Sequence, residues 1–332
     1  MSGVRVAALC GGVGGAKLAD GLLRTLPPDA LGLIVNTGDD FEHLGLHISP
    51  DIDTVLYTLS GLANPATGWG RRDETWTFMR ALESLGGATW FRLGDGDLAL
   101  HVERTRRLAA GEPLSAIVAD VARRLGIAAR VLPMSDARLR TRVLSDAGLI
   151  DFQDYFVRQQ CAPRVHEIRF DAAAHCQPAP GVAELLRQPG LEAIVICPSN
   201  PYLSVDPVLA VPGLRELLRS AGVPIVAVSP LIAGAAVKGP TAKIMAELGK
   251  PISALEVARH YRGLIDGFVL DQRDAALAGA MASETGVAVR LCDTLMQSDD
   301  DRQRVAQASL DLATALRHDR AGALAARRSR PT

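Results

Sequence analysis

The stretch "ALCGGVGGAKLADGLLRTL", residues 8–26, joins an apolar run to a helical pattern through a glycine turn. The turn contains four glycines and is followed by a lysine: Gly11, Gly12, Gly14, Gly15 and Lys17. A strand, a glycine turn and a helix in this order place backbone amides at a helix N-terminus, where they can bind an anion. A tight turn alone needs only one or two glycines. We therefore predict that this segment binds a phosphate group.

Two common phosphate-binding loops do not match the segment. A Walker A loop ends in Gly-Lys-Ser/Thr, whereas this chain has Ala16, Lys17 and Leu18. The dinucleotide fingerprint requires a third glycine where Lys17 stands and an acidic residue after the next strand, where the chain has Asn36. The sequence thus disfavours a nicotinamide dehydrogenase and predicts a less common nucleotide site that includes Asn36.

Apolar runs elsewhere in the chain indicate the fold class. Each run ends in Gly, Asn, Ser, Pro or Asp, and the runs are 4–10, 31–38, 191–200, 223–230 and 267–271. Continuous apolar runs between helical patterns are typical of parallel strands that are buried on both faces. We predict an α/β protein with a Rossmann-like, three-layer, doubly wound parallel sheet. Its ligands should bind at the carboxyl ends of the strands.

The segment 95–128 lacks strand patterns and contains two helical stretches separated by Gly111 and Pro113, with Ser115 as the expected cap of the second. We predict a small inserted helical domain there. Segments 1–94 and 129–316 should form the Rossmann-like domain, and the basic tail 317–332 should be frayed.

Composition excludes several classes of protein. The chain has 332 residues, is 48% hydrophobic and has a net charge of −1, so it can form a large core and shows no bias towards nucleic acid or anionic membranes. No apolar run approaches the roughly 18 residues of a membrane span, and the N-terminus lacks a secretory signal. We expect a cytoplasmic protein. Its five dispersed cysteines suggest buried reduced thiols rather than zinc ligands or disulfides.

Four aspartates lie close to the predicted phosphate loop. Asp39 and Asp40 follow the second apolar run, and Asp51 and Asp53 precede an apolar helix. Carboxylate oxygens are hard ligands that suit Mg²⁺ bound to a diphosphate. We predict Mg²⁺ as the cofactor and Asp39, Asp40 and Asp53 as its ligands, while turn formation or helix capping remains an alternative for each aspartate. Gly45 between His43 and His47 disfavours a zinc site on a helix.

A series of motifs resembles the 2-phospho-L-lactate transferase family of coenzyme F-420 biosynthesis. The motifs occur in order over nearly the whole chain: "GGVGGAKL", "NTGDD", "SPDIDTVLYTLSG", "GWGRRDETW", "WFRLGDGDLALH", "PMSD", "PSNP", "AVSPL", "KGP" and "DTLM". The resemblance implies a Mg²⁺-dependent homodimer. It also implies transfer of a phosphorylated three-carbon acid (phospholactyl, phosphoenolpyruvyl or phosphoglyceryl) from its guanosine diphosphate-linked form. The acceptor would be the ribityl hydroxyl of the deazaflavin Fo, and GMP would be released.

The same resemblance assigns roles to particular residues. Asp53 of "SPDIDT" and Arg92 of "WFRLGD" match positions that bind Fo in the family. The glycine loop, "PMSD" and "PSNP" match segments around the guanosine donor, which adds Ser135, Asp136, Ser199 and Asn200 to the predicted nucleotide site. Gly96 stands where an arginine is expected in many relatives, which puts one substrate contact in doubt.

The chemistry of such a transfer agrees with these residues. Attack of an alcohol on a diphosphate needs in-line positioning, charge neutralisation and a carboxylate near the hydroxyl. Asp53 is the predicted catalytic residue, and no Ser-His-Asp or Cys-His arrangement suggests a covalent intermediate. One of the three tryptophans could stack on a flavin-like ring or belong to the core. The alternative function is a non-catalytic regulatory protein of related fold that binds a nucleotide-sugar or a dinucleotide.

Overall fold

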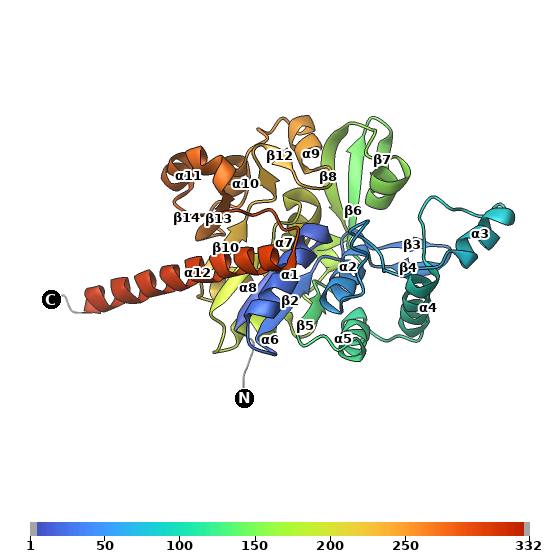
Figure 1. The fold of residues 1–332 in the computed structure, drawn as a ribbon, viewed down its shortest axis with the longest axis horizontal. Coiled ribbons are helices and arrows are strands. Elements are labelled where there is room, and N and C mark those ends of the chain that lie inside the picture. The colour runs from blue at the N-terminus through green and yellow to red at the C-terminus, as the bar shows by residue number, and fades with distance from the viewer. Residues whose placement is uncertain (1–4, 329–332) are drawn as a thin grey trace.

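The computed structural model describes residues 5–328 and contains a central seven-stranded sheet (Figure 1). Across the sheet the strands are β14 (Ala288–Cys292), β13 (Gly267–Asp271), β10 (Ile225–Val228), β9 (Ala193–Ile196), β1 (Val6–Cys10), β2 (Leu31–Val35) and β5 (Arg130–Pro133). All neighbouring strands are parallel. The chain moves from β1 outward to β5 and then returns to β9 on the other side of β1. This order confirms the predicted fold class and places a topological switch point between β1 and β9.

Burial on both faces explains the continuous apolar runs. In β1, Ala7 and Leu9 belong to the core on one face, whereas Val6, Ala8 and Cys10 belong to the core on the other. Successive side chains of a strand point to opposite faces, so a strand between two cores needs apolar residues at every position. All five cysteines are free, and three of them are buried.

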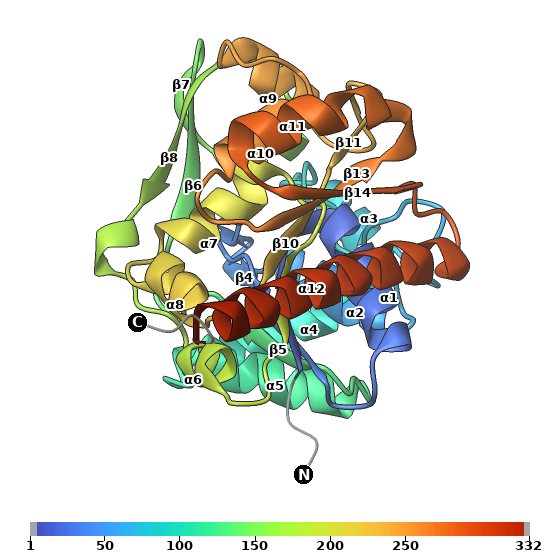
Figure 2. The same ribbon diagram turned by 90° about the vertical axis from the view of Figure 1, so that its left-hand side faces the viewer.

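Helices cover both faces of the sheet. One face packs against α1 (Gly12–Thr25), α2 (Pro50–Leu59), α5 (Leu114–Arg124) and α12 (Asp299–Arg328). The other face packs against α6 (Val182–Arg187), α7 (Asp206–Ala210), α8 (Leu214–Ser220), α9 (Thr241–Glu247), α10 (Ala254–His260) and α11 (Ala278–Thr285). Figure 2 shows the long helix α12 beside α1.

The two predicted helical stretches are α4 (Asp95–Ala109) and α5. Helix α5 packs on the central sheet, whereas α4 joins a group of elements that begins earlier in the chain, with the hairpin β3 (Phe41–His43) and β4 (Leu46–Ile48), and with α3 (Thr77–Ser84). This group has a small apolar cluster of its own around Ile48, Met79 and Leu93. Segment 95–128 is thus helical, but its two helices pack against different parts of the fold.

Ser115 does not cap α5 as expected. The helix begins at Leu114, so Ser115 lies in its first turn. The carboxylate of Asp136 instead accepts hydrogen bonds from the amide of Ser115, across 2.6 Å, and from its hydroxyl, across 2.7 Å. Asp136 thus supplies the cap from outside the helix.

A second, antiparallel sheet was not predicted. Its strands are β7 (Gly148–Asp151), β6 (Arg140–Ser145) and β8 (Val165–Asp171), and a π-helical turn, Asp154–Arg158, follows β7. The remaining short elements are β11 (Leu231–Ile232), β12 (Ala235–Ala236), the π-helical turn Pro201–Val205 and the 3₁₀ turns Ala173–His175 and Gln272–Leu277.

The long helix α12 enters the predicted tail segment. Helix α12 continues as far as Arg328, and Arg320 forms an ion pair with Asp266 that ties the helix to the residue before β13. Residues 329–332 of the expected frayed segment lie outside the described residues. Among the helices of residues 5–328, none is long and apolar enough to cross a membrane.

Candidate active site

The glycine turn is a very tight junction between β1 and α1. β1 ends at Cys10 and α1 begins at Gly12, whose φ of 62° lies in the left-handed region that favours glycine. A Cβ atom on Gly14 would lie 2.5 Å from the carbonyl oxygen of Pro198, and one on Gly15 would lie 2.6 Å from Oγ of Ser199. Gly14 and Gly15 therefore allow α1 to contact the segment that follows β9. Gly12 has no such neighbour and faces open space.

The sequence predicted that the backbone amides of the glycine turn bind an anion. Two of these amides already donate to side chains of the protein. The amide of Gly12 donates to the carboxylate of Asp51 across 2.7 Å, and the amide of Gly11 donates to Oγ of Ser199 across 3.2 Å. The start of α2 and the end of β9 pack against the junction and supply these acceptors. An anion bound here would therefore depend on side-chain charge more than on these two amides.

A cavity of about 710 Å³ opens at the switch point. Its wall includes residues that follow β1, β2, β9 and β10, as expected for the carboxyl edge of the sheet. Nine predicted site residues line it: Gly11, Gly12, Gly14, Lys17, Asp39, Asp53, Arg92, Ser199 and Asn200. The other predicted site residues are absent from its lining: Gly15, Asn36, Asp40, Ser135 and Asp136.

Asp39 and Asp51 form a buried pair of carboxylates beneath the glycine turn. The Asn36 amide donates to Asp51 across 2.9 Å and also to Asp39, so Asn36 joins the pair rather than lining the cavity. Burial raises the pKa of Asp51 to about 6. Burial, together with repulsion from Asp51, raises the pKa of Asp39 well above its usual range. The metal prediction omitted Asp51, although it lies beside Asp53 in "SPDIDT".

Asp40 lies in a different environment from Asp39. It accepts hydrogen bonds from the Ser49 hydroxyl across 2.8 Å and lies 3.0 Å from Nε2 of His47. These contacts fasten the hairpin β3–β4 to the start of α2. The other carboxylate oxygen of Asp40 is buried without a hydrogen-bond partner among the described residues.

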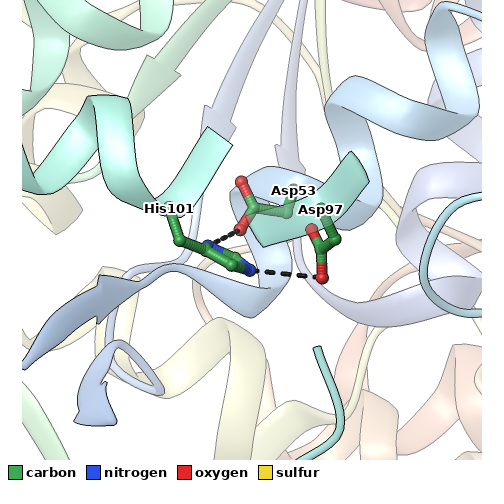
Figure 3. Close-up of side chains that lie close together, drawn as sticks. All are labelled: Asp53, Asp97 and His101. Atoms are coloured by element: carbon green, nitrogen blue, oxygen red, sulfur yellow. Dashed lines mark ion pairs between the residues drawn. The ribbon is translucent and has the colours of Figure 1, made fainter. Parts of the chain in front are cut away.

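Asp53 belongs to a third group, between α2 and α4. It forms a buried ion pair with both terminal nitrogens of Arg104. His101 lies between Asp53 and Asp97, with Nδ1 3.7 Å from the first carboxylate and Nε2 3.2 Å from the second (Figure 3). The Tyr57 hydroxyl donates to Asp97 across 2.6 Å. The three predicted metal ligands Asp39, Asp40 and Asp53 thus belong to three separate hydrogen-bonding groups.

Arg92 reaches the cavity from a loop. Residues 92–94 have no regular structure, and the Arg92 guanidinium lies 4.2 Å from the centroid of the Trp76 ring. The nearby carboxylate of Asp95 is not its partner, because it accepts hydrogen bonds from the amides of Thr77 and Phe78. A cation–π contact therefore orients Arg92 at the cavity wall.

The cavity wall has an aromatic part and a cationic part. Trp90 packs edge-on against Phe91, and Phe152 stacks on Phe156 with ring centroids 5.4 Å apart; all four rings line the cavity. The cationic part contains Lys238 and Lys17, whose ammonium donates to the Met296 carbonyl across 2.6 Å. Burial lowers the pKa of Lys17. Such a wall can bind a planar ring and an anionic group in one cavity.

The motif "PSNP" lies at the cavity wall, whereas Ser135 and Asp136 of "PMSD" do not line the cavity. Asn200 of the first uses its side-chain oxygen to accept from the amides of Tyr202 and Leu203, while its side-chain nitrogen is buried without a partner among the described residues. That nitrogen can donate to a ligand. In the second motif, Ser135 donates to the Gln177 carbonyl and Asp136 caps α5.

Several site residues had no assigned role in the sequence. Asp97 and His101 stand four residues apart in "GDGDLALH", a spacing that places both on one face of a helix and could have drawn attention to them. Lys238 stands in the quoted motif "KGP". Phe152 and Phe156 lie in a segment with no signal of function, and only the folded chain places them at the cavity.

Comparison with known proteins identifies the class of protein that has this fold and site. A sequence model of the family described as "2-phospho-L-lactate transferase CofD" matches residues 6–309. The chain therefore belongs to this family of transferases.

Known relatives align with this chain over almost the full length of both proteins. The chain is 40% identical over 320 residues to a phosphoenolpyruvate transferase of Streptomyces griseus, with 95% of this chain and 100% of the relative covered. It is 34% identical over 306 residues to the 2-phospho-L-lactate transferase of Methanocaldococcus jannaschii, with 91% and 96% covered. The fold resembles that of a UPF0052 family member from Bacillus halodurans, with a TM-score of 0.59, 17% identity and coverage of 93% and 99%.

Proposed function

We propose that the protein transfers a phosphorylated three-carbon acid from its guanosine diphosphate-linked form to the ribityl hydroxyl of Fo and releases GMP. The observation that carries this proposal is the cavity at the switch point, whose wall has both a cationic and an aromatic part. A diphosphate donor needs the first, and a tricyclic acceptor suits the second. Membership of the transferase family supports this function over a non-catalytic regulatory protein.

The donor is assigned to the part of the cavity near the glycine turn. Lys17 and Lys238 would face its phosphates, and the unpartnered nitrogen of Asn200 would donate to it. Asp39 and Asp51 fit a Mg²⁺ ion, because they offer hard oxygen ligands and a cation would relieve their mutual repulsion. Bound Mg²⁺ would neutralise charge on the diphosphate.

The acceptor is assigned to the aromatic part. Its ring would lie among Trp90, Phe91 and Phe156, and Arg92 and Asp53 would bind its polar groups. In the reaction the ribityl oxygen forms a bond to the phosphorus that bears the three-carbon acid. The bond from that phosphorus to the GMP oxygen breaks, and the hydroxyl proton passes to a carboxylate, for which Asp53 is the candidate. No covalent enzyme intermediate is needed.

Among the three possible donors, we place the phosphoenolpyruvyl form first. Relatives with 39–40% identity have the name phosphoenolpyruvate transferase, whereas the relative named for phospholactate is 34% identical. We also propose that the protein is cytoplasmic and acts as a homodimer, which gel filtration with light scattering would test.

The deciding experiment offers the purified protein Fo, Mg²⁺ and each guanosine diphosphate-linked acid in turn. Mass spectrometry of the deazaflavin product identifies the acid that was added, and chromatography measures GMP. Equal amounts of product and GMP are expected, most rapidly with the phosphoenolpyruvyl donor. Binding of the donor without any product would contradict the proposed transfer.

A further inference from the structure

We infer that Asp53, Asp97 and His101 form a binding site for a divalent transition-metal ion (Figure 3). Each side chain offers one ligand atom, and these atoms lie within 4.8 Å of one another. Asp97 and His101 share one face of α4, and Asp53 reaches them from α2. The site is separate from the pair Asp39 and Asp51, because Asp51 accepts hydrogen bonds from Gly12 and Asn36 and has none with the three residues of this cluster.

The environment of His101 points to a missing ligand. The residue is 1% exposed, and within residues 5–328 neither ring nitrogen makes a hydrogen bond of good geometry, although Nε2 is close to Asp97. Both nitrogens nevertheless face carboxylates, at 3.7 Å for Asp53 and 3.2 Å for Asp97. Buried polar atoms without partners are uncommon, since burial removes them from water without compensation. A cation bound to one ring nitrogen and to the carboxylates would provide that compensation for this nitrogen.

The charge balance of the cluster agrees with a bound cation. The guanidinium of Arg104 offsets the charge of Asp53, and Asp97 has the neutral hydroxyl of Tyr57 and the His101 ring as its side-chain partners. The two carboxylates and one guanidinium leave one negative charge in excess, which a proton on the imidazole or a bound cation would cancel. A carboxylate oxygen that already accepts a hydrogen bond retains a further lone pair for a metal. Arg104 and Tyr57 can therefore remain in place as partners of the ligands.

The donor set selects the kind of ion. One imidazole nitrogen with two carboxylate oxygens suits Mn²⁺ or Zn²⁺, because imidazole is a ligand of transition metals, whereas Mg²⁺ prefers oxygen ligands only. The cluster lies at the wall of the cavity, since all three residues contribute to its lining. The ion would thus lie beside the acceptor part of the site.

Metal binding can be measured without either substrate, so its outcome is independent of the proposed function. The EDTA-treated, dialysed protein is titrated with Mn²⁺ in the presence of excess Mg²⁺, and free Mn²⁺ is measured by electron paramagnetic resonance. His101→Asn and Asp97→Asn remove one ligand each. His260→Asn is the matched control, because His260 is bonded to Asp206 and does not line the cavity.

The wild-type protein and the control should bind a single Mn²⁺ that Mg²⁺ does not displace. The two cluster variants should bind it at least about tenfold more weakly. Thermal melting verifies that the variants fold. If either does not, pulsed resonance on Mn²⁺-loaded wild-type protein shows whether a histidine nitrogen is bound to the ion. The inference is overturned if His101→Asn binds Mn²⁺ as tightly as the wild type, if Mg²⁺ displaces all of the Mn²⁺, or if no nitrogen coupling is present.

Discussion

The backbone amide of Gly12 donates a hydrogen bond to the carboxylate of Asp51 across 2.7 Å. This bond joins the start of α1 to the start of α2 directly beneath the cavity. Asp51 is buried, and its pKa is raised to about 6 because burial disfavours the charged form. At neutral pH the folded protein therefore contains a carboxylate that is more costly to ionise than the same group in the unfolded chain.

This relationship predicts how stability depends on pH. Because the folded pKa of about 6 exceeds the unfolded value of about 4, the folded state binds more protons between these values, and the free energy of unfolding should fall as pH rises through them. The loss is on the order of 3 kcal/mol at most. Urea unfolding of metal-free protein at several pH values measures it. Asp51→Asn should flatten this part of the profile, and identical profiles for the variant and the wild type would contradict the assignment.

Asp53→Asn should reduce turnover by about a hundredfold, which is typical of the removal of one preorganised electrostatic group at a reacting centre. It should also lower the melting temperature, because Arg104 would be left buried without its carboxylate partner. Steady-state rates well below the melting temperature separate the two effects. Glu192→Gln is the control, since it removes only surface ion pairs with Arg5 and Arg317, far from the cavity lining. Near-normal turnover in the Asp53 variant would exclude a catalytic role.

Arg92→Ala should raise KM for Fo by about tenfold, equivalent to about 1.4 kcal/mol, because a charge-assisted hydrogen bond to the acceptor would be lost. KM for the guanosine donor should stay unchanged. Arg72→Ala is the matched control, since Arg72 is an exposed arginine that pairs with Asp73 and does not line the cavity. If the Arg92 variant merely melts at a lower temperature while both KM values are unaltered, its contact with Trp76 is structural.

Chelation by EDTA should abolish transfer, and Mg²⁺ should restore it, because the donor phosphates and the nearby carboxylates otherwise repel each other. Asp39→Asn should increase the Mg²⁺ concentration needed for half-maximal rate. Asp40→Asn provides the comparison, since its partners are Ser49 and His47 and it does not line the cavity. Full activity in metal-free buffer would exclude a role for Mg²⁺.

Asp136→Ala should destabilise the protein by about 1 kcal/mol, the usual cost of losing a helix cap, because the first turn of α5 loses its acceptor. KM for the donor should not change, since Asp136 does not line the cavity. Asn200→Ala is the comparison at the cavity wall and should weaken donor binding. A large rise in donor KM for Asp136→Ala would support the role that its motif suggested.

The sequence was sufficient to predict the five central strands, because strands buried on both faces require continuous apolar runs. It did not reveal β14, whose residues Arg290 and Leu291 are exposed at the sheet edge. Nor did it reveal β6, where the buried positions include Thr141 and Ser145. Polar residues on the buried face of a strand conceal the alternation on which prediction depends.

The sequence also predicted only part of the site, because it does not show which separate segments pack together. The glycine turn could be located from its residues, but not the packing of Gly14 and Gly15 against the end of β9. Asp51 and Asp53 are two residues apart, and the sequence pattern did not distinguish the environment of one from that of the other. In the fold one pairs with Asn36 and the other with Arg104, and such partners depend on how α2 is oriented between separate elements.

The aromatic part of the cavity has a consequence for how the enzyme can diversify. Phe152 and Phe156 come from the segment after β7, which belongs to the small antiparallel sheet, whereas Lys17 comes from α1 of the central layer. Under the proposed assignment, substitutions in the small sheet would alter the shape of the acceptor wall without changing the donor wall. Preference for one substrate would then change during evolution while preference for the other is inherited intact.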